Sequence, residues 1–246
     1  NVTNAPLTTF TIGKRDITAA WTGTLSRIYG DANPAVDTNN FTYSGFVNGD
    51  TNAAVTALAD YLGTTPSTNV GTVNVNGTFS SANYNVTNTP TTTMSITKRD
   101  ITAVVNDTTR AYGDTNPSLN WSNVTWSNLA NGENGAVLDT MTLNVAGTAT
   151  ATANTGSTHA ITLTGFGDNN YNLTGYTAGT LSIDKRDITG TVANASRTYG
   201  DANPSFSWSN VSWSNLANGE TGAVLDAMTI DASTATATVN AGTSHS

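Results

Sequence analysis

The sequence predicts an all-β protein built as a rod of tandem small β-sandwich modules, immunoglobulin-like in the broad sense, of about 85 residues each. Three observations predict this class. The letters KRDIT recur at 14–18, 98–102 and 185–189, which are 84 and 87 residues apart. Apolar and polar residues alternate with period two around each copy. Turn motifs rich in Gly, Asn and Pro separate the alternating stretches.

The repeats divide the chain into four parts. Residues 1–13 match residues 85–97 and are expected to be the closing strand of a preceding repeat. Repeat 1 covers residues 14–97, repeat 2 covers 98–184, and repeat 3 covers 185–246. Repeat 3 stops before the counterparts of the last strands of repeat 2. We therefore expect it to be incomplete at its C-terminal end, with an unpaired sheet edge.

Alternating runs on both sides of KRDIT predict strands. Met94 and Ile96 lie at even positions, whereas Ile101 and Ala103 lie at odd positions. A change of parity reverses the buried face, so Lys-Arg-Asp marks the place where the chain leaves one sheet and enters the next. No flexible linker intervenes, and neighbouring repeats should be closely coupled. In the first copy, the expected half-buried positions are Phe10, Ile12, Ile17, Ala19 and Trp21.

Turns and one helix are expected between the strands. Turn signals lie at the YGDxNP motif of each copy, at the Asn-Gly pairs, and at residues 168–170. The one helical candidate spans Ala53–Leu62, and Ala136–Asp139 and Ala223–Asp226 are its shorter counterparts. A short helix packed on a sheet would make each module β-grasp-like, which is the alternative to the sandwich.

Composition narrows the classes of function. The formal net charge is −8 and the nine basic residues are scattered in threes, so no patch can neutralise a run of phosphates and no nucleic-acid partner is expected. No apolar run approaches the roughly 20 residues of a membrane-spanning helix, so this segment is expected to have no membrane span. The absence of Cys removes disulfides and thiolate metal sites.

The basic residues recur in register. All nine occupy three repeat positions: the Lys-Arg pair of KRDIT and an Arg two residues before the tyrosine of YGD. A charge used once for chemistry has no reason to recur in this way, whereas a structural ion pair does. The pattern indicates a scaffold and not an enzyme. The repeat-motif residues expected to be structural are Lys14, Arg15, Tyr29, Gly30, Asp31, Pro34, Lys98, Arg99, Tyr112, Gly113, Asp114, Pro117, Lys185, Arg186, Tyr199, Gly200, Asp201 and Pro204.

The order of the motifs resembles that of a known family. KRDIT is followed by R-x-YGD-x-NP, by SGFVNGD at Ser44–Asp50, and by NYN with a closing TLSI strand. This sequence resembles the MBG/YDG-type repeats of very large bacterial surface proteins, including filamentous-haemagglutinin-like adhesins, over essentially the whole chain. The resemblance implies an extracellular location, at the cell surface or in the extracellular matrix. It also implies tandem arrays, a stalk or adhesive role, and no catalytic residues.

The acidic residue of YGDxNP is the candidate metal ligand. Asp31, Asp114 and Asp201 offer carboxylate oxygens that Ca²⁺ could use. The same pattern forms a turn when side-chain oxygens bind nearby backbone N–H groups, and the loop lacks the further acidic residues of a cation site. We therefore expect a turn, with no metal and no cofactor.

The tryptophans offer a second kind of contact, stacking on glycans. Most should pack in the core, because a small module needs its largest apolar side chains inside. In each WSNxxWS block five residues separate the two indoles, which would lie on opposite faces of an uninterrupted strand. Trp121 and Trp208 are expected to be the exposed members and the candidate glycan contacts.

Sequons of the N-x-S/T type offer sites for glycosylation. An Asn- and Thr-rich composition by itself produces many of them, so they are candidates only. The candidate positions are Asn40, Asn76, Asn106, Asn123, Asn172, Asn194 and Asn210.

The function that these features favour is a structural and adhesive segment of an extracellular bacterial surface fibre or giant adhesin. Its partners would be neighbouring repeats or identical subunits, and glycans or a host surface. Residues 1–13 are a strand of the type that repeat 3 lacks, so head-to-tail strand complementation would generate a filament. In a longer polypeptide the same strand would arrive covalently. The alternative function is an array of carbohydrate-binding modules.

Overall fold

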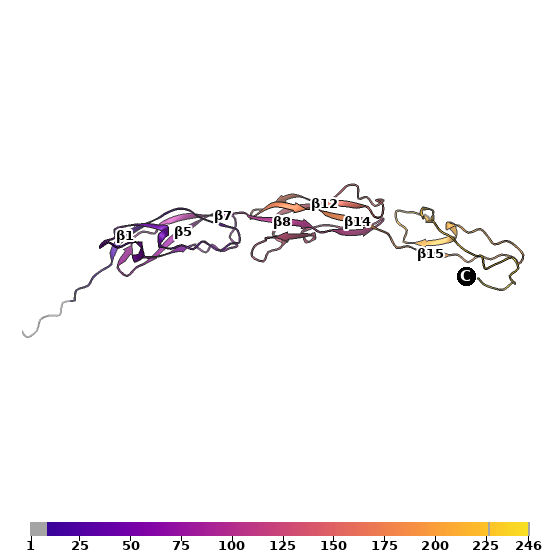
Figure 1. Cartoon of the computed structure of the whole chain (residues 1–246), viewed down its shortest axis with the longest axis horizontal. Coiled ribbons are helices and arrows are strands. Elements are labelled where there is room, and N and C mark those ends of the chain that lie inside the picture. Colours follow the sequence, from indigo (N-terminus) through magenta and orange to yellow (C-terminus); the bar gives the residue numbers. More distant parts are fainter. Residues whose placement is uncertain (1–8, 226, 246) are drawn as a thin grey trace, which may run out of the picture. The chain divides into compact units, whose positions relative to one another are not determined.

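The computed structural model describes residues 9–225 and 227–245, and it is all-β as the sequence predicts (Figure 1). Its helical segments are six 3₁₀ turns of three residues each within the described residues. The chain forms two compact units, which are described separately. Unit 1 holds the residues up to Val104 together with Val124–Thr142 and Gly165–Tyr176, and unit 2 holds Val105–Asn123, Leu143–Thr164 and the residues from Thr177 onward.

The first sheet of repeat 1 has three strands and lies in unit 1. Its order is β3 (Phe41–Ser44), β1 (Arg15–Trp21) and β6 (Tyr84–Val86), with β1 antiparallel to β3 and parallel to β6. Ile17 and Ala19 of β1 are buried and the residues beside them are exposed. The period-two pattern therefore does set the buried face of this strand.

The second sheet of repeat 1 has four strands and also lies in unit 1. β2 and β7 are parallel, and the other neighbouring strands are antiparallel. The two central strands supply Val75, Met94 and Ile96, which are at most 2% exposed. In order across the sheet the strands are β2 (Leu25–Ile28), β7 (Thr91–Thr97), β5 (Gly71–Ser80) and β4 (Thr56–Asp60).

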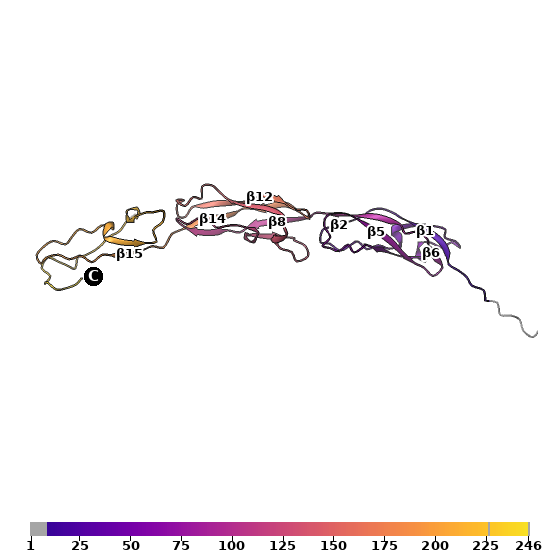
Figure 2. The same ribbon diagram turned by 180° about the vertical axis from the view of Figure 1, so that it is seen from behind.

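The two sheets of repeat 1 pack against each other (Figure 2). Phe41 of the first sheet contacts Phe79 of the second, with ring centroids 4.9 Å apart and ring planes at 75°. Trp21 Nε1 donates to the carbonyl oxygen of Pro90, just before β7, at 2.9 Å. Two sheets that bury their apolar faces against each other form a β-sandwich, so the predicted class is confirmed.

The chain changes sheet at Lys98. β7 ends at Thr97 in the second sheet of repeat 1, and the next strand begins one residue later in a different sheet. The order of that sheet is β10 (Val124–Ser127), β8 (Arg99–Val105) and β13 (Tyr171–Thr177). This is the change of sheet that the parity shift predicts.

The four-stranded sheet of repeat 2 lies mostly in unit 2. It has the strand order of the four-stranded sheet of repeat 1, and β14 pairs with β9 in parallel as β7 pairs with β2. The strands in order are β11 (Thr140–Val145), β12 (Thr158–Gly167), β14 (Gly179–Asp184) and β9 (Thr108–Ala111).

Repeat 3 forms one two-stranded sheet in its described residues. β15 (Thr189–Val192) pairs antiparallel with β16 (Val211–Ser214). Residues 195–198 and 227–232 correspond to β9 and β11 of repeat 2, yet they form no strand. In repeat 2 those two strands pair with β14 and β12. Among the described residues of repeat 3, no strand stands beside either segment to accept and donate its backbone hydrogen bonds.

The described part of the predicted closing strand, residues 9–13, precedes β1 without a partner strand. Residues 9–14 have no strand pairing, and Phe10 and Ile12 are 89% and 84% exposed. Their counterparts Met94 and Ile96 are buried because β2 and β5 flank β7 on both sides. No described strand flanks residues 9–14 in that way. The rest of this expected strand, residues 1–8, lies outside the described residues.

The predicted helix at Ala53–Leu62 is wrong. A 3₁₀ turn occupies Asn52–Ala54, and strand β4 begins at Thr56. The β-branched pair Val55 and Thr56 favours extended backbone, and β5 supplies a strand for it to pair with. The shorter counterparts, Ala136–Asp139 and Ala223–Asp226, are not helices in their described residues either. The 3₁₀ turns Gly135–Val137 and Gly222–Val224 are each followed by one extended residue, Leu138 or Leu225, and Asp226 lies outside the described residues. The 3₁₀ turns are η1 (Thr38–Asn40), η2 (Asn52–Ala54), η3 (Trp121–Asn123), η4 (Gly135–Val137), η5 (Trp208–Asn210) and η6 (Gly222–Val224).

The Asn-Gly turns form as predicted. In all three repeats both residues of the pair have positive φ, which is the geometry that Asn-Gly favours in tight turns. Each turn follows the strand β3, β10 or β16 and leads to the residue Asp50, Glu133 or Glu220. The acidic residue therefore has the same place in every repeat.

Candidate functional site

The YGD motif forms a tight turn at the end of β2 in repeat 1. Asp31 N donates to the carbonyl oxygen of Ile28 at 3.1 Å, and Gly30 has a φ of 87°, which L side chains rarely adopt. Tyr29 is 4% exposed although it lies beside this surface turn. It belongs to a buried cluster that includes Ala130 and Tyr171 of repeat 2 as well as residues of repeat 1.

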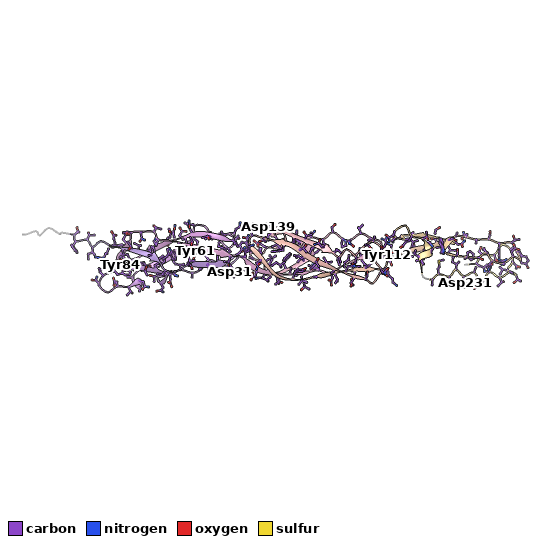
Figure 3. All side chains as sticks on the ribbon, turned by 90° about the horizontal axis from the view of Figure 1, so that it is seen from above. Asp31, Tyr61, Tyr84, Tyr112, Asp139 and Asp231 are labelled. Carbon is purple, nitrogen blue, oxygen red and sulfur yellow. The ribbon has the colours of Figure 1, made fainter. Side chains whose placement is uncertain are left out.

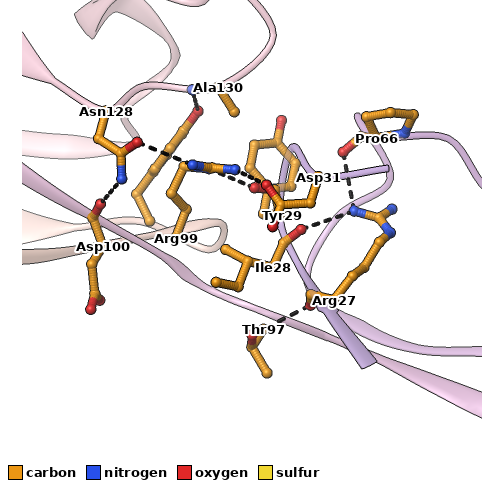
Figure 4. A network of polar contacts seen from close by, with 11 residues as sticks. Arg27, Ile28, Tyr29, Asp31, Pro66, Thr97, Arg99, Asp100, Asn128 and Ala130 are labelled. Atoms are coloured by element: carbon orange, nitrogen blue, oxygen red, sulfur yellow. Dashed lines mark hydrogen bonds and ion pairs between the residues drawn. The ribbon is translucent and has the colours of Figure 1, made fainter. Parts of the chain in front are cut away.

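Arg99 of repeat 2 holds this turn from the other side (Figure 4). Its Nε donates to the carbonyl oxygen of Tyr29 at 2.7 Å, and its Nη2 forms an ion pair with Asp31. Nη1 donates to Asn128 Oδ1 at 3.1 Å. The Arg99 side chain is 17% exposed. One guanidinium fork thus joins the first strand of repeat 2 to the YGD turn of repeat 1, and all of these residues belong to unit 1.

Glu133 adds a second contact at the same place. Tyr29 OH donates to Glu133 Oε1 at 2.7 Å, and Tyr171 OH donates to Oε2. The two phenol rings meet edge to face, with centroids 5.4 Å apart. Tyr171 OH also accepts from Ala130 N at 2.9 Å. One carboxylate therefore ties the tyrosine of repeat 1 to a tyrosine of repeat 2.

The surroundings keep both phenols protonated. Burial raises the pKa of Tyr29 and of Tyr171 above the ordinary value for tyrosine, and the hydrogen bonds to Glu133 raise both further. A protonated phenol donates and an ionised carboxylate accepts, so the raised pKa values and the hydrogen bonds describe the same arrangement.

A second junction with the same residues lies in unit 2. Arg186 Nε donates to the carbonyl oxygen of Tyr112 at 2.7 Å, and Nη2 forms an ion pair with Asp114. Nη1 donates to Asn215 Oδ1 at 2.8 Å. Tyr112 OH donates to Glu220 Oε1 at 2.5 Å, and this hydrogen bond raises the pKa of Tyr112. Asp31 and Tyr112, one residue of each junction, are labelled in Figure 3.

A small residue of the following repeat packs on the glycine of each YGD turn. A Cβ built on Gly30 would collide with the Cβ of Ala130, and one built on Gly113 would collide with the Cβ of Ala217. The glycine therefore serves two purposes: it permits the positive φ of the turn, and it admits the neighbouring repeat.

The third recurring basic position acts inside its own repeat. Arg27 and Arg110 are buried, at 6% and 7% exposure. Arg110 Nε donates to Asn116 Oδ1 at 2.9 Å and Nη2 donates to the carbonyl oxygen of Thr150 at 2.6 Å. Arg27 Nη2 donates likewise to Thr65 O at 2.5 Å, and burial lowers the pKa of Arg27. Both arginines bind backbone oxygens of a loop in their own module, and Arg110 also holds the asparagine of its YGDxNP segment.

The YGD acids are ion-pair partners where the structure shows their contacts. Asp31 binds Arg99 and Asp114 binds Arg186, whereas Asp201 has no ion-pair partner among the described residues. No group of three or more metal-ligating side chains gathers in the part of the chain that the structure describes. The weak calcium candidates thus have a structural use in two of the three repeats. EDTA is still expected to leave the melting temperature unchanged.

The remaining motif residues are also placed. Lys14 and Lys98 are exposed and donate to the carbonyl oxygens of Ser81 and Asp168, at 2.7 and 2.5 Å. Lys185 is exposed as well. The prolines Pro34, Pro117 and Pro204 follow the YGD turns, where the chain has no strand pairing.

Trp121 and Trp208 lie at the surface, at 41% and 44% exposure, and Trp126 and Trp213 are half-buried. The reason expected for their exposure was wrong, because the two tryptophans of a pair do not lie on one uninterrupted strand. Trp121 is in the turn η3, and β10 begins only at Val124. Stacking on glycans stays a prediction.

The sequon asparagines divide into two groups. Asn40, Asn123 and Asn210 close the turns η1, η3 and η5, where each Oδ1 accepts from a backbone N–H three residues earlier at 2.9 Å. These three side chains already have a structural role. Asn106, Asn172 and Asn194 are exposed, and Asn76 is half-buried in β5.

One Ser–His contact lacks the geometry of a nucleophile and base. Ser157 Oγ lies 3.0 Å from His159 Nε2, but its proton is donated to the carbonyl oxygen of Asn154 at 2.6 Å. A serine has one hydroxyl proton, so His159 must be the donor to Ser157. His159 Nδ1 then accepts from Thr148 Oγ1, also at 3.0 Å.

Glu133, Glu220 and Tyr171 were not among the expected site residues. The sequence holds one signal that could have found the acids, because an acidic residue follows the Asn-Gly pair in all three repeats. The basic residues were recognised by the same kind of register. The pairing of each acid with a tyrosine 104 or 108 residues away has no such signal.

Comparison with known proteins agrees with the three repeats. A family profile described as MBG domain (YGX type) matches residues 17–94, 101–182 and 188–244, which together are most of the chain. Each match begins just after a Lys-Arg-Asp. No curated protein matches the chain significantly. No helix among the described residues is long and apolar enough to cross a membrane.

Proposed function

Because the chain belongs to the family of the MBG domain (YGX type), we propose that it is a structural and adhesive segment of an extracellular bacterial surface fibre or giant adhesin. Repeat modules of this kind are typical of surface proteins. The observation that carries the structural role is the junction. Each of two successive repeats is joined to the one before it by an Arg fork and a Glu–Tyr hydrogen bond, with no linker between them.

An array of modules that carries mechanical force needs joints that transmit the force and resist bending. Only Lys98 separates the last strand of repeat 1 from the first strand of repeat 2, and the Arg99 fork closes the joint from the side. Two ordered contacts beside a one-residue connection leave little rotational freedom at the joint. The proposed function needs no catalytic residue and no cofactor.

The accessibility of the chain on intact cells tests its location. Antibodies raised against the 246-residue chain should label intact cells, and added protease should remove the label. Labelling that appears only after lysis contradicts a surface role. Cells that lack the coding sequence serve as the control.

A groove in repeat 3 suggests how neighbouring segments are assembled. A groove lies there, lined by Arg197, Tyr199, Phe206, Ile230 and Val239 among others. Arg197 corresponds to Arg110 in β9, the strand that pairs with β14 in repeat 2. We propose that a strand of the β7 or β14 type fills this groove, either from a continuation of repeat 3 in a longer polypeptide or from residues 9–13 of another copy.

Two measurements separate these sources. A denaturing gel of the native material should show a band near 25.4 kDa if separate copies assemble, and a far larger product if the array is covalent. In the isolated chain, Ile12→Asp should abolish strand donation, because its counterpart Ile96 is 2% exposed. Thr11→Asp is the matched control, since its counterpart Ser95 is exposed. Equal effects of the two variants contradict strand insertion.

One observation favours the second candidate function, an array of carbohydrate-binding modules. Trp121 and Trp208 expose indole surface at the same position of successive repeats, which glycans could stack on. Trp121→Ala with Trp208→Ala should then abolish saturable binding to a glycan array while the melting temperature stays unchanged. Binding that survives both changes excludes these indoles as the contacts.

A further inference from the structure

The YGD turn of repeat 3 has the same form as the two turns that are covered. We define its tail face as Tyr199, Gly200 and Asp201. Asp201 N donates to the carbonyl oxygen of Thr198 at 3.1 Å, the distance found in both other repeats, and Gly200 has a φ of 92°. The turn is therefore formed before any partner binds.

The tail face has no cover in the described residues. Tyr199 is 61% exposed, whereas Tyr29 is 4% exposed at the same position of repeat 1. A Cβ built on Gly200 would meet no atom within 4 Å, although the same construction on Gly30 or Gly113 collides with the following repeat. A surface that two repeats bury is left in solvent in the third.

Repeat 1 carries the complementary surface at its other end. We define its head face as Arg15, Val47 and Asp50, which stand where Arg99, Ala130 and Glu133 stand in repeat 2. Tyr84 OH donates to Asp50 Oδ2 at 2.7 Å and accepts from Val47 N at 3.3 Å. Tyr171 makes the same two contacts in repeat 2. The head face is thus assembled in the same way.

Arg15 keeps two donor groups available. Its Nε donates to the carbonyl oxygen of Gly45 at 3.0 Å, and within the described residues neither terminal nitrogen has a protein partner. In Arg99 those nitrogens bind Asn128 and Asp31. The fork that closes a junction in repeat 2 is exposed and unoccupied at the start of repeat 1.

We infer that the head face of one copy of this chain docks on the tail face of a second copy, in the geometry of the two internal junctions. The inference rests on the proposed function. Arg15 forms the ion pair with Asp201 and binds the carbonyl oxygen of Tyr199, and Asp50 accepts from the Tyr199 hydroxyl. A basic fork meets an acidic turn, so the faces are complementary in charge as well as shape. The contact is head-to-tail, because it joins two different faces of the chain.

Two residues make this contact weaker than an internal junction. Val47 carries two methyl groups more than the alanine that packs on Gly30 or Gly113, and Asp50 is one methylene shorter than Glu133 or Glu220. Val47→Ala and Asp50→Glu should therefore each tighten association. Non-specific aggregation would not become tighter after either of these two changes.

Sedimentation velocity of the 246-residue chain over a range of concentrations tests the inference. The wild-type chain should form concentration-dependent oligomers. Arg15→Asp or Asp201→Arg alone should weaken association by more than about tenfold, because each places like charges opposite one another. A mixture of the two variants should associate again, since each then meets an opposite charge. Lys14→Asp changes the net charge as much as Arg15→Asp and is the matched control.

Several outcomes overturn the inference. They are a wild-type chain that stays monomeric, charge variants that associate like the wild type, and a mixture that does not recover. If association survives the charge variants but is lost in Ile12→Asp, strand insertion stands and the docking of the faces fails. If no association occurs while intact cells are labelled, the surface role stands without self-assembly. Circular dichroism checks that each exposed substitution leaves the fold intact.

Discussion

The junction between repeats 1 and 2 (junction 1) and the junction between repeats 2 and 3 (junction 2) share their contacts on the YGD turn but differ in the contacts of the acid. Both have an arginine fork on the YGD turn and an alanine packed on its glycine. In unit 1 the acid Glu133 binds two tyrosines, whereas in the described residues of unit 2 Glu220 binds one, Tyr112. Asn170 adds a bond from Val70 N at 3.0 Å in unit 1. Tyr29 is buried, and Tyr112 is half-exposed.

The difference comes from one strand. Tyr171 begins β13 and Asn170 precedes it, and β13 pairs with β8, which carries the Arg99 fork. The described residues of repeat 3 include no counterpart of β13. The arginine fork depends on residues near the start of a repeat. The hydrogen bonds of Glu133 to Tyr29 and Tyr171 also need β13, a strand near the end of that repeat. A junction is therefore complete only when the whole following module is folded.

The largest expected effect comes from the YGD glycines. Gly113→Val should destabilise its junction by about 3–5 kcal/mol, since a β-branched residue at positive φ is strained and the new side chain collides with Ala217. Thermal unfolding of the full chain measures the loss. Gly200→Val has the same backbone strain without the collision and should cost clearly less. Equal losses in the two variants would show that Ala217 adds nothing.

Removal of the acids should separate the two junctions. Glu133→Ala removes the acceptor of two phenol hydroxyls and should cost about 2–4 kcal/mol, whereas Glu220→Ala removes the acceptor of one and should cost about half as much. Urea unfolding followed by tryptophan fluorescence measures both. Equal costs would mean that the contact with Tyr171 does not stabilise junction 1.

Alkaline pH should weaken junction 1 more than junction 2. The pKa values of Tyr29 and Tyr171 are raised above the unfolded value of about 10, so their contribution to stability is fully present below about pH 10. It is lost as the pH rises through the folded pKa values. Only one tyrosine, Tyr112, contributes in the same way at junction 2.

The measurement compares urea midpoints at about pH 8 and about pH 10.5. Tyr171→Phe removes one titrating group and should flatten the pH dependence of unit 1, with unit 2 as the internal reference. A Tyr171→Phe chain with an unchanged pH profile contradicts this origin of the alkaline loss.

The smallest expected effects compare the Asn170 hydrogen bond, which is described only in unit 1, with the arginine ion pair, which both junctions have. Asn170→Ala should destabilise unit 1 by about 1 kcal/mol, because it removes the acceptor for Val70 N and a bond to Asn69. Arg99→Gln and Arg186→Gln should each cost about 1–2 kcal/mol of stability. The two costs should be nearly the same, since the two ion pairs are almost equally exposed. Hydrogen exchange of the Val70 amide reports the first change directly. Slow exchange that persists in Asn170→Ala would contradict the contact.

Local patterns in the sequence predicted most of the fold. Period two placed Ile17 and Ala19 inside because successive side chains of a strand point to opposite faces. The parity shift located the change of sheet at Lys98 for the same reason. The Asn-Gly turns followed from the ease with which these two residues adopt positive φ. The helix at Ala53–Leu62 failed because pairing with β5 outweighed a weak helical preference.

The candidate site was only half visible in the sequence. Register showed that Arg99 and Asp31 are scaffold residues, and they do form an ion pair. It could not show that the two belong to different repeats, because identical copies do not say whether a contact lies within a repeat or between neighbours. Glu133 was missed for the same reason.

The sequence by itself determined the β class, the three repeats, the turns and the residues that recur, since these depend on properties that act over a few positions along the chain. Only the tertiary structure decided which recurring residues meet. Tyr29 and Glu133 are 104 residues apart, and what joins them is the way the strands of two modules end at a common surface. Pairing at that distance depends on the position of whole strands, which no local pattern of residues encodes.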